Sequence, residues 1–151
     1  GGVLGRDGAI YGIPSNANSV LKILPHSGEV VTFGGPLPGK YKWSRGTLGG
    51  DGAIYGIPAR AESVLKISPD TGEVTTIGNL PKGDWKWHGG VVGRDGAIYA
   101  IPANADSVLK IVPQLDQVTT LGGPFPGGWK WYGGILADDG AIYGIPYCAD
   151  A

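Results

Sequence analysis

The chain has 151 residues, a length that suits one domain, and it contains 29 glycines, 12 prolines and one cysteine. Its formal net charge of −1 at pH 7 gives no basic footprint for a phosphate backbone, so nucleic acid is not expected as a partner. No run of 18 apolar residues occurs, so neither a transmembrane helix nor a membrane partner is expected. The single Cys148 excludes a disulfide within the chain.

A repeat of 44 residues runs through the sequence without insertion or deletion. The segment Asp-Gly-Ala-Ile-Tyr begins at Asp7 and returns at Asp51, Asp95 and Asp139. The sequence therefore divides into repeats 1–44, 45–88 and 89–132 and a partial repeat 133–151, and we expect residues 1–151 to form a single repeat domain. Repeats of about 40 to 50 residues built from short strands are typical of β-propeller blades.

Each repeat is predicted to contain four short strands, illustrated here by the third copy. Its apolar, β-branched runs in chain order are 87–93, 97–101, 107–111 and 118–121. Short turn or loop segments separate these runs, and essentially no helix is expected because no segment has apolar residues at helical spacing. The predicted fold is all-β, with three four-stranded antiparallel blades and half of a fourth.

Two features of the strands predict how the blades are arranged. The second strand is apolar on both faces, with Tyr99 and Ile101 on one side and Ile98 and Ala100 on the other, so it must be covered by neighbours on both sides. The first strand carries a Gly-Gly pair, as at 89–90, which favours the innermost position, where backbones approach closely. The Thr-rich fourth strand is then outermost.

The residues with side chains suited to ligand binding lie on two loops that are predicted to share one end of each blade. The candidate ligand-binding residues on the loop between the fourth and first strands are Tyr41, Lys42, Trp85, Lys86, Trp129 and Lys130. Those on the loop between the second and third strands are Asn16, Asn18, Arg60, Glu62, Asn104 and Asp106. Trp offers a flat apolar face and one N–H donor, and Lys offers a mobile cation, so this face can stack sugars or hold an anionic chain.

Each of these residues also has a purely structural interpretation. Trp43, Trp87 and Trp131 are expected to pack between blades, while the intervening lysines point outward as solvated heads. Strand alternation would place Tyr41 on the same side as Trp43. The Asn and Asp side chains of the second loop are expected to satisfy backbone groups in Asx-turns.

The amino-acid sequence of the repeat resembles that of a known class of propeller. The first 11 residues, the Ser-Val-Leu-Lys-Ile strand and the segment Pro-Asp-Thr-Gly-Glu-Val-Thr-Thr-Ile-Gly are similar to repeats of NHL and streptogramin-lyase-like propellers. This resemblance covers the whole chain and implies a propeller fold. In the lyases it also implies chemistry by a histidine and a metal on one face of the ring. Of the two histidines here, His26 falls in a turn at the opposite end, and His88, beside the first strand, is expected to be a surface or packing variant.

Three functions compete at this point. The first is a non-enzymatic binding module, lectin-like, for carbohydrate or peptide. The second is a propeller fragment that completes its ring as a homodimer, because two copies contain about seven repeats. The third is a lyase or hydrolase with a site at the ring mouth. Catalytic motifs such as GxSxG and HExxH are absent, so no catalytic residue, metal ligand or cofactor is predicted, and the enzyme ranks last.

Overall fold

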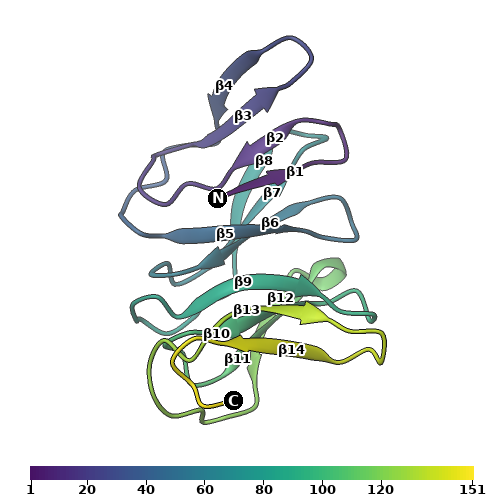
Figure 1. Ribbon diagram of the computed structural model, residues 1–151. Helices are drawn as coiled ribbons and strands as arrows, with labels where there is room; N and C mark the ends of the chain where they lie inside the picture. Colours follow the sequence, from purple (N-terminus) through teal and green to yellow (C-terminus); the bar gives the residue numbers. More distant parts are fainter.

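The computed structural model describes all residues from Gly1 to Ala151, which form antiparallel sheets that follow one another in chain order (Figure 1). We call these sheets blades 1 to 4. Blade 1 contains β1 (Gly2–Leu4), β2 (Ile10–Gly12), β3 (Val20–Leu24) and β4 (Glu29–Phe33). Blade 2 contains β5 (Trp43–Leu48), β6 (Ile54–Pro58), β7 (Val64–Ser68) and β8 (Glu73–Ile77). Blade 3 contains β9 (Trp87–Val92), β10 (Ile98–Pro102), β11 (Val108–Val112) and β12 (Gln117–Leu121). Blade 4 contains only β13 (Trp131–Leu136) and β14 (Ile142–Pro146).

The strand order within each blade confirms the predicted meander. The first strand pairs with the second, the second with the third and the third with the fourth, always antiparallel. The first strands of successive blades, β1, β5, β9 and β13, pack against one another, so they are the inner strands. Gly90 shows why glycine is needed there, since an added Cβ would lie 2.8 Å from the hydroxyl oxygen of Thr47 in the neighbouring blade.

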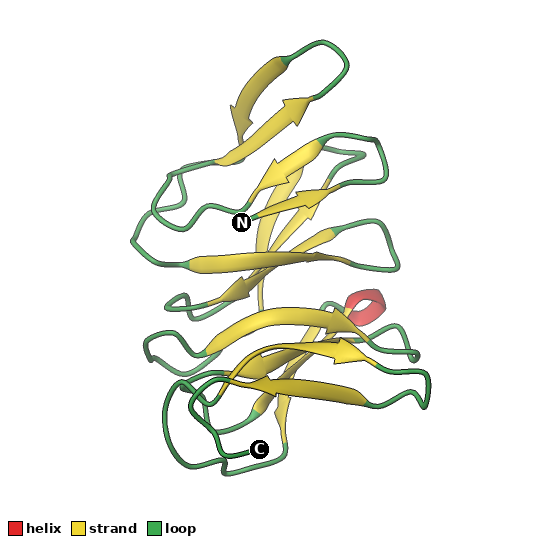
Figure 2. Ribbon diagram, in the orientation of Figure 1, coloured by secondary structure: helices red, strands yellow, loops and turns green.

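One short helical turn interrupts the all-β pattern, and it was not predicted (Figure 2). It covers Pro113–Leu115, where the third repeat has Pro-Gln-Leu-Asp in place of the Pro-Asp-Thr-Gly of the second. Asp116 stands in the position of Gly72 and adopts the same left-handed conformation, with φ of 48°. None of the helical structure is long and apolar enough to cross a membrane.

The repeated Asp-Gly-Ala-Ile-Tyr segment closes the turn between the first and second strands. In the third copy one oxygen of Asp95 accepts a hydrogen bond from the backbone N–H of Ala97 at 3.1 Å, and the other accepts one from the hydroxyl of Tyr99 at 2.6 Å. The same pair of bonds occurs in all four copies. The aspartate of this segment therefore serves the turn in each blade.

The core consists of two clusters, one between blades 1 and 2 and one between blades 2 and 3. Every residue of β6 is buried, which confirms that the second strand of a middle blade is covered on both faces. The face of blade 2 with Tyr55 and Ile57 packs on the face of blade 3 with Ile98, Leu109 and Ile111. Burial of such side chains contributes roughly 1.5 to 3 kcal/mol each, which is why the blades depend on their neighbours.

Candidate functional site

The two loops that carry the candidate residues lie together at one end of the blades, as predicted. The linker from the fourth to the first strand is held by the loop between the second and third strands of the preceding blade. The backbone N–H of Leu37 donates to the carbonyl of Asn18 at 2.7 Å, that of Leu80 to Glu62 at 2.7 Å, and that of Phe125 to Asp106 at 2.8 Å. We call this end of the molecule the loop face.

Three aromatic side chains form a row across the loop face, one from each junction between blades. The ring centroids of Tyr41 and Trp85 are 5.6 Å apart, and those of Trp85 and Trp129 are 6.0 Å apart. Tyr41 and Trp129 are each 39% exposed. We call these three residues the aromatic row.

The backbone of the aromatic row has an uncommon conformation. The φ angles of Tyr41, Trp85 and Trp129 are 54°, 51° and 52°, in the left-handed region that favours glycine. For a bulky residue this conformation costs about 1 to 2 kcal/mol. It also ends the alternation of side chains along the strand, so the position of Tyr41 could not be deduced by counting from Trp43.

Side chains and backbone of the preceding blade hold the aromatic row in this conformation. The Asn16 side-chain oxygen accepts a hydrogen bond from the backbone N–H of Tyr41 at 2.7 Å, and Asn104 does the same for Trp129 at 2.7 Å. These bonds span 25 residues and join two blades, so the expectation of local Asx-turns is wrong for Asn16 and Asn104. Their side chains position the aromatic row.

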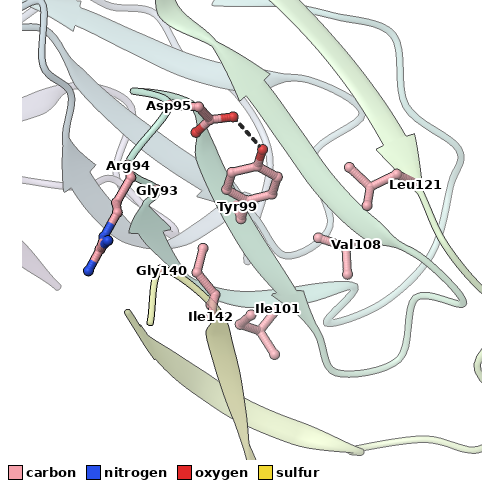
Figure 3. A pocket seen from close by; sticks show the side chains of 9 residues that line it. All are labelled: Gly93, Arg94, Asp95, Tyr99, Ile101, Val108, Leu121, Gly140 and Ile142. Atoms are coloured by element: carbon pink, nitrogen blue, oxygen red, sulfur yellow. Dashed lines mark hydrogen bonds between the residues drawn. The ribbon is translucent and has the colours of Figure 1, made fainter. Parts of the chain in front are cut away.

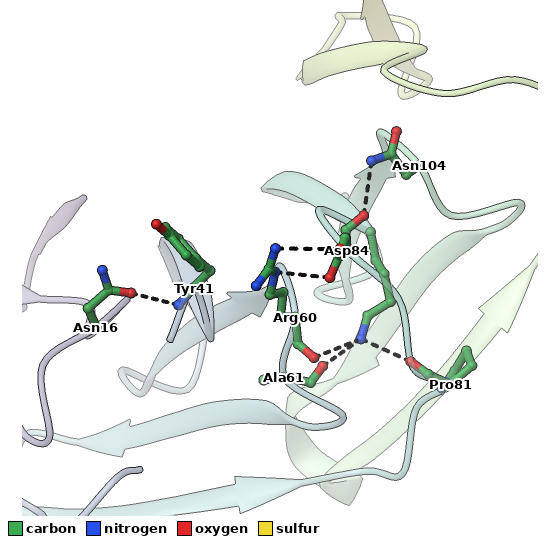
Figure 4. A network of polar contacts seen from close by, with 8 residues as sticks. Asn16, Tyr41, Arg60, Ala61, Pro81, Asp84 and Asn104 are labelled. Atoms are coloured by element: carbon green, nitrogen blue, oxygen red, sulfur yellow. Dashed lines mark hydrogen bonds and ion pairs between the residues drawn. The ribbon is translucent and has the colours of Figure 1, made fainter. Parts of the chain in front are cut away.

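The second junction has a different arrangement, because Arg60 stands where the first and third repeats have Asn. Arg60 Nε forms an ion pair with Asp84 at 2.9 Å, and its guanidinium lies 4.9 Å from the ring centroid of Tyr41 (Figure 4). The Asn104 amide donates to the carbonyl of Asp84 at 2.9 Å. The row is thus bordered by a connected group of polar side chains.

The three candidate lysines, Lys42, Lys86 and Lys130, are buried, so the expectation of solvated heads is wrong. Lys86 is 3% exposed, and its ammonium donates hydrogen bonds to the carbonyls of Ala61 at 2.7 Å, Pro81 at 2.9 Å and Arg60 at 3.5 Å. Lys42 and Lys130 are held in the same way. Burial lowers the pKa of all three amines. With its three protons directed at carbonyls, each lysine joins a linker to the preceding blade.

The remaining predicted residues divide into core and solvent-exposed positions. Trp43 and Trp87 are buried between blades, and their indole N–H groups donate to the carbonyls of Ser63 and Ser107, both at 2.8 Å. Asn18, Glu62 and Asp106 are exposed, and only their backbone carbonyls take part in the hydrogen bonds of the linkers. Their side chains face solvent on the loop face.

A second group of residues, absent from the sequence-based candidates, lies next to Trp85. A cavity of about 580 Å³ between the inner strands is lined by Ser44, Arg45, Trp85, His88 and Tyr132, together with glycines of β1 and β5. The His88 and Tyr132 rings stack with centroids 3.4 Å apart. Burial and the nearby Arg45 lower the pKa of His88 to about 4, so the imidazole is neutral at pH 7. The sequence signals were that positions 44, 88 and 132 carry different residues in an otherwise regular repeat and that Arg45 stands where the other copies have Gly.

Another cavity, of about 480 Å³, lies between blades 3 and 4 (Figure 3). Tyr99, Ile101 and Val108 of blade 3 and Ile142 of blade 4 line it. Between blades 2 and 3 the equivalent space is filled by the third strand, through Leu109 and Ile111. Blade 4 has only two strands, so no third strand fills this space, and the polar side chains that line the cavity already have partners: Asp95 accepts from Tyr99, and Arg94 donates to the carbonyl of Asp138.

These repeats and sheets define a β-propeller repeat protein. The chain belongs to the family described as a repeat of unknown function (DUF6923), whose model matches residues 2–144. No curated protein matches the sequence.

Solved structures share the fold, as the resemblance of the repeat predicted. A streptogramin B lyase is 20% identical with a TM-score of 0.76, over 97% of this chain and 47% of the lyase. A virginiamycin B lyase from Staphylococcus aureus is 20% identical with a TM-score of 0.75, over 99% of this chain and 56% of the lyase. Hydrazine synthase from Kuenenia stuttgartiensis is 15% identical with a TM-score of 0.72, over 99% of this chain and 42% of the synthase chain. The chain thus spans about half the length of the lyases, and at these identities the likeness shows the fold alone.

Proposed function

We propose that this chain is a non-enzymatic binding and scaffold module that holds a carbohydrate on the aromatic row and completes its ring with a second copy. The observation that carries the binding function is the left-handed backbone at all three positions of the aromatic row. Glycine would remove the strain at each of them, yet each carries a large aromatic residue. Strain of this kind is retained where the side chain has a task.

The chemistry of the loop face favours a sugar. The flat apolar faces of Tyr41, Trp85 and Trp129 match the C–H faces of pyranose rings, while the exposed Asn18 and Asp106 side chains offer hydrogen-bonding groups beside them. Similar positions recur in successive blades, which suits an extended ligand with repeating units. Catalysis requires different groups that converge on one bond, which is why we propose binding without turnover.

A direct test measures binding of neutral and acidic oligosaccharides by calorimetry and tryptophan fluorescence. We expect Trp85→Ala and Trp129→Ala to weaken binding by about tenfold or more each, as loss of a stacking platform does. His26→Ala, at the opposite end of the blades, is the matched control and should bind normally. Unchanged sugar binding in both Trp variants, or binding of extended peptides alone, would reject the carbohydrate site.

Ring completion is proposed because the two uncovered faces of the molecule are the two halves of one interface. Blade 1 exposes Ile10 and Leu21, the equivalents of Ile98 and Leu109, which are buried between blades 2 and 3. Blade 4 exposes Tyr143 and Ile145, the equivalents of Tyr55 and Ile57 on the opposing side of that interface. A head-to-tail contact between copies would bury both faces, and such contacts close into a ring when the rotation between copies brings the last face back to the first.

Light scattering tests the scaffold function separately from ligand binding. We expect a mass near twice 15.5 kDa for the wild type. Leu21→Lys and Ile145→Lys should each be monomeric, because each substitution places a charge in both contacts of the dimer. Mixing the two variants should restore dimers, since one of the two contacts then joins unaltered faces. Leu115→Lys, on an exposed turn, is the control, and a monomeric wild type would reject ring completion by a second copy.

A further inference from the structure

The cavity between the inner strands carries cationic and polar groups that the fold does not use. Ser44 and Arg45 come from β5, His88 from β9 and Tyr132 from β13, and Trp85 of the aromatic row closes one side. The stacked pair His88 and Tyr132 provides an aromatic wall. Since Trp85 belongs to both groups, the cavity is continuous with the aromatic row.

Arg45 differs from the other arginines in having no polar partner. Arg6 donates to the carbonyl of Gly50 at 2.7 Å, Arg94 donates to the carbonyl of Asp138, and Arg60 is paired with Asp84. Arg45 has only the ring of Tyr132, with 5.8 Å between the guanidinium carbon and the ring centroid. No Asp or Glu lines the cavity. A guanidinium with free donors fits a carboxylate, which it can bind through two parallel hydrogen bonds.

Two buried polar atoms next to Arg45 also lack partners. The Nδ1 atom of His88 and the hydroxyl oxygen of Ser44 are buried without a hydrogen bond. His88 as a whole is only 6% exposed. An unsatisfied buried polar atom costs roughly 1 to 3 kcal/mol, and such atoms are uncommon in folded proteins. Both atoms belong to residues that line the same cavity, and because both atoms are buried, a ligand there reaches them only after the side chains rotate.

Comparison of equivalent positions in the repeat copies shows that the blade fold does not require these residues. Position 45 carries Gly in the other copies, at Gly1, Gly89 and Gly133, and those strands form without an arginine. Positions 44, 88 and 132 carry three different residues. The regular blade therefore needs neither Arg45 nor His88.

We propose that this cavity binds the carboxylate of an acidic sugar, so that the ligand of the aromatic row is a uronate-containing oligosaccharide. Arg45 binds the carboxylate, Ser44 and His88 hydrogen-bond to the same sugar unit, and Trp85 and Tyr132 hold its ring. This inference rests on the proposed carbohydrate function and names the class of sugar. The neutral units of the ligand then continue along the aromatic row.

The test compares trigalacturonate with its methyl ester, which has the same shape without the charge. Calorimetry on the full chain, in its native oligomeric state, should show binding of the acid that is about ten- to a hundredfold tighter, as expected for hydrogen bonds to a charged group. Arg45→Gly, which restores the residue of the other copies, should reduce the affinity for the acid to that for the ester. Arg45→Gln should give the same loss, and Arg6→Gly removes the same charge at the opposite end as a control.

The outcomes distinguish the two proposals. Equal affinity for acid and ester, unaffected by Arg45→Gly, overturns the uronate site. If that binding still depends on Trp129, the carbohydrate function is upheld. Binding of the acid that depends on Arg45 but not on Trp129 overturns the role of the aromatic row and keeps the anion site. If the chain binds a glutamate-rich peptide more tightly than trigalacturonate, the assignment to a sugar is overturned. If it binds neither the acid nor the ester, both proposals are overturned.

Discussion

The side-chain oxygen of Asn16 accepts a hydrogen bond of 2.7 Å from the backbone N–H of Tyr41, 25 residues further along the chain and in the next blade. The bond holds an aromatic residue in a left-handed conformation at a junction between blades. Asn104 repeats the arrangement with Trp129. The geometry of the candidate site thus depends on contacts between repeats.

Asn16→Ala should destabilise the junction between blades 1 and 2. Loss of one hydrogen bond that spans two blades costs about 1 kcal/mol, which should appear in the midpoint of chemical denaturation. Asn18→Ala, two residues away, is the matched control because the Asn18 side chain makes no hydrogen bond. Equal effects of the two substitutions would show that the Asn16 bond has no energetic role.

Trp129→Gly and Trp129→Ala should differ in stability although both remove the ring. Glycine adopts φ of 52° without strain, whereas alanine does not, so the Gly variant should be more stable by about 1 kcal/mol. Denaturant unfolding of the two variants measures this difference directly. If the Ala variant is the more stable, the backbone at position 129 is not strained.

Lys86→Met should be strongly destabilising, because it leaves three carbonyls at the second junction without their donor. We expect a loss of about 3 kcal/mol, within the range for removing a charged hydrogen-bonding group from a buried site. Lys82→Met, in the same linker but exposed, should change stability little. Thermal unfolding compares the two, and equal melting temperatures would contradict the structural role of Lys86.

His88 should make the stability depend on pH between its lowered pKa of about 4 and its ordinary pKa of 6.5. In this range the unfolded chain binds the proton and the folded chain does not, so stability falls as pH falls, by up to about 1.4 kcal/mol per pH unit. Above pH 6.5 the contribution of His88 is constant.

His88→Tyr, which introduces the residue of position 132, provides the comparison for this pH dependence. The variant should lose the fall in stability between pH 6.5 and 4 that His88 causes, measured by denaturation at a series of pH values. An identical pH profile in the wild type would mean that folding does not lower the pKa of His88.

The sequence was sufficient for the architecture because a propeller repeats local rules. The 44-residue period, the Asp-Gly turns and the alternating apolar residues determine four strands per blade, and the glycines at 89–90 identify the inner strand. The exception was the turn at Pro113–Leu115, where the sequence departs from the repeat. Each of these signals operates within one repeat or between neighbouring strands.

Only the tertiary structure decided which of the candidate residues face solvent and which face one another. Lys86 resembles a surface lysine in sequence, yet carbonyls of a blade 2 loop and of its own linker surround its ammonium. Trp85 and Trp129 meet because their backbone leaves the strand conformation, and Arg45 of blade 2 reaches the ring of Tyr132 in blade 4. The physical reason is that strand periodicity places side chains within a blade, whereas the site forms where separate blades converge on the inner strands.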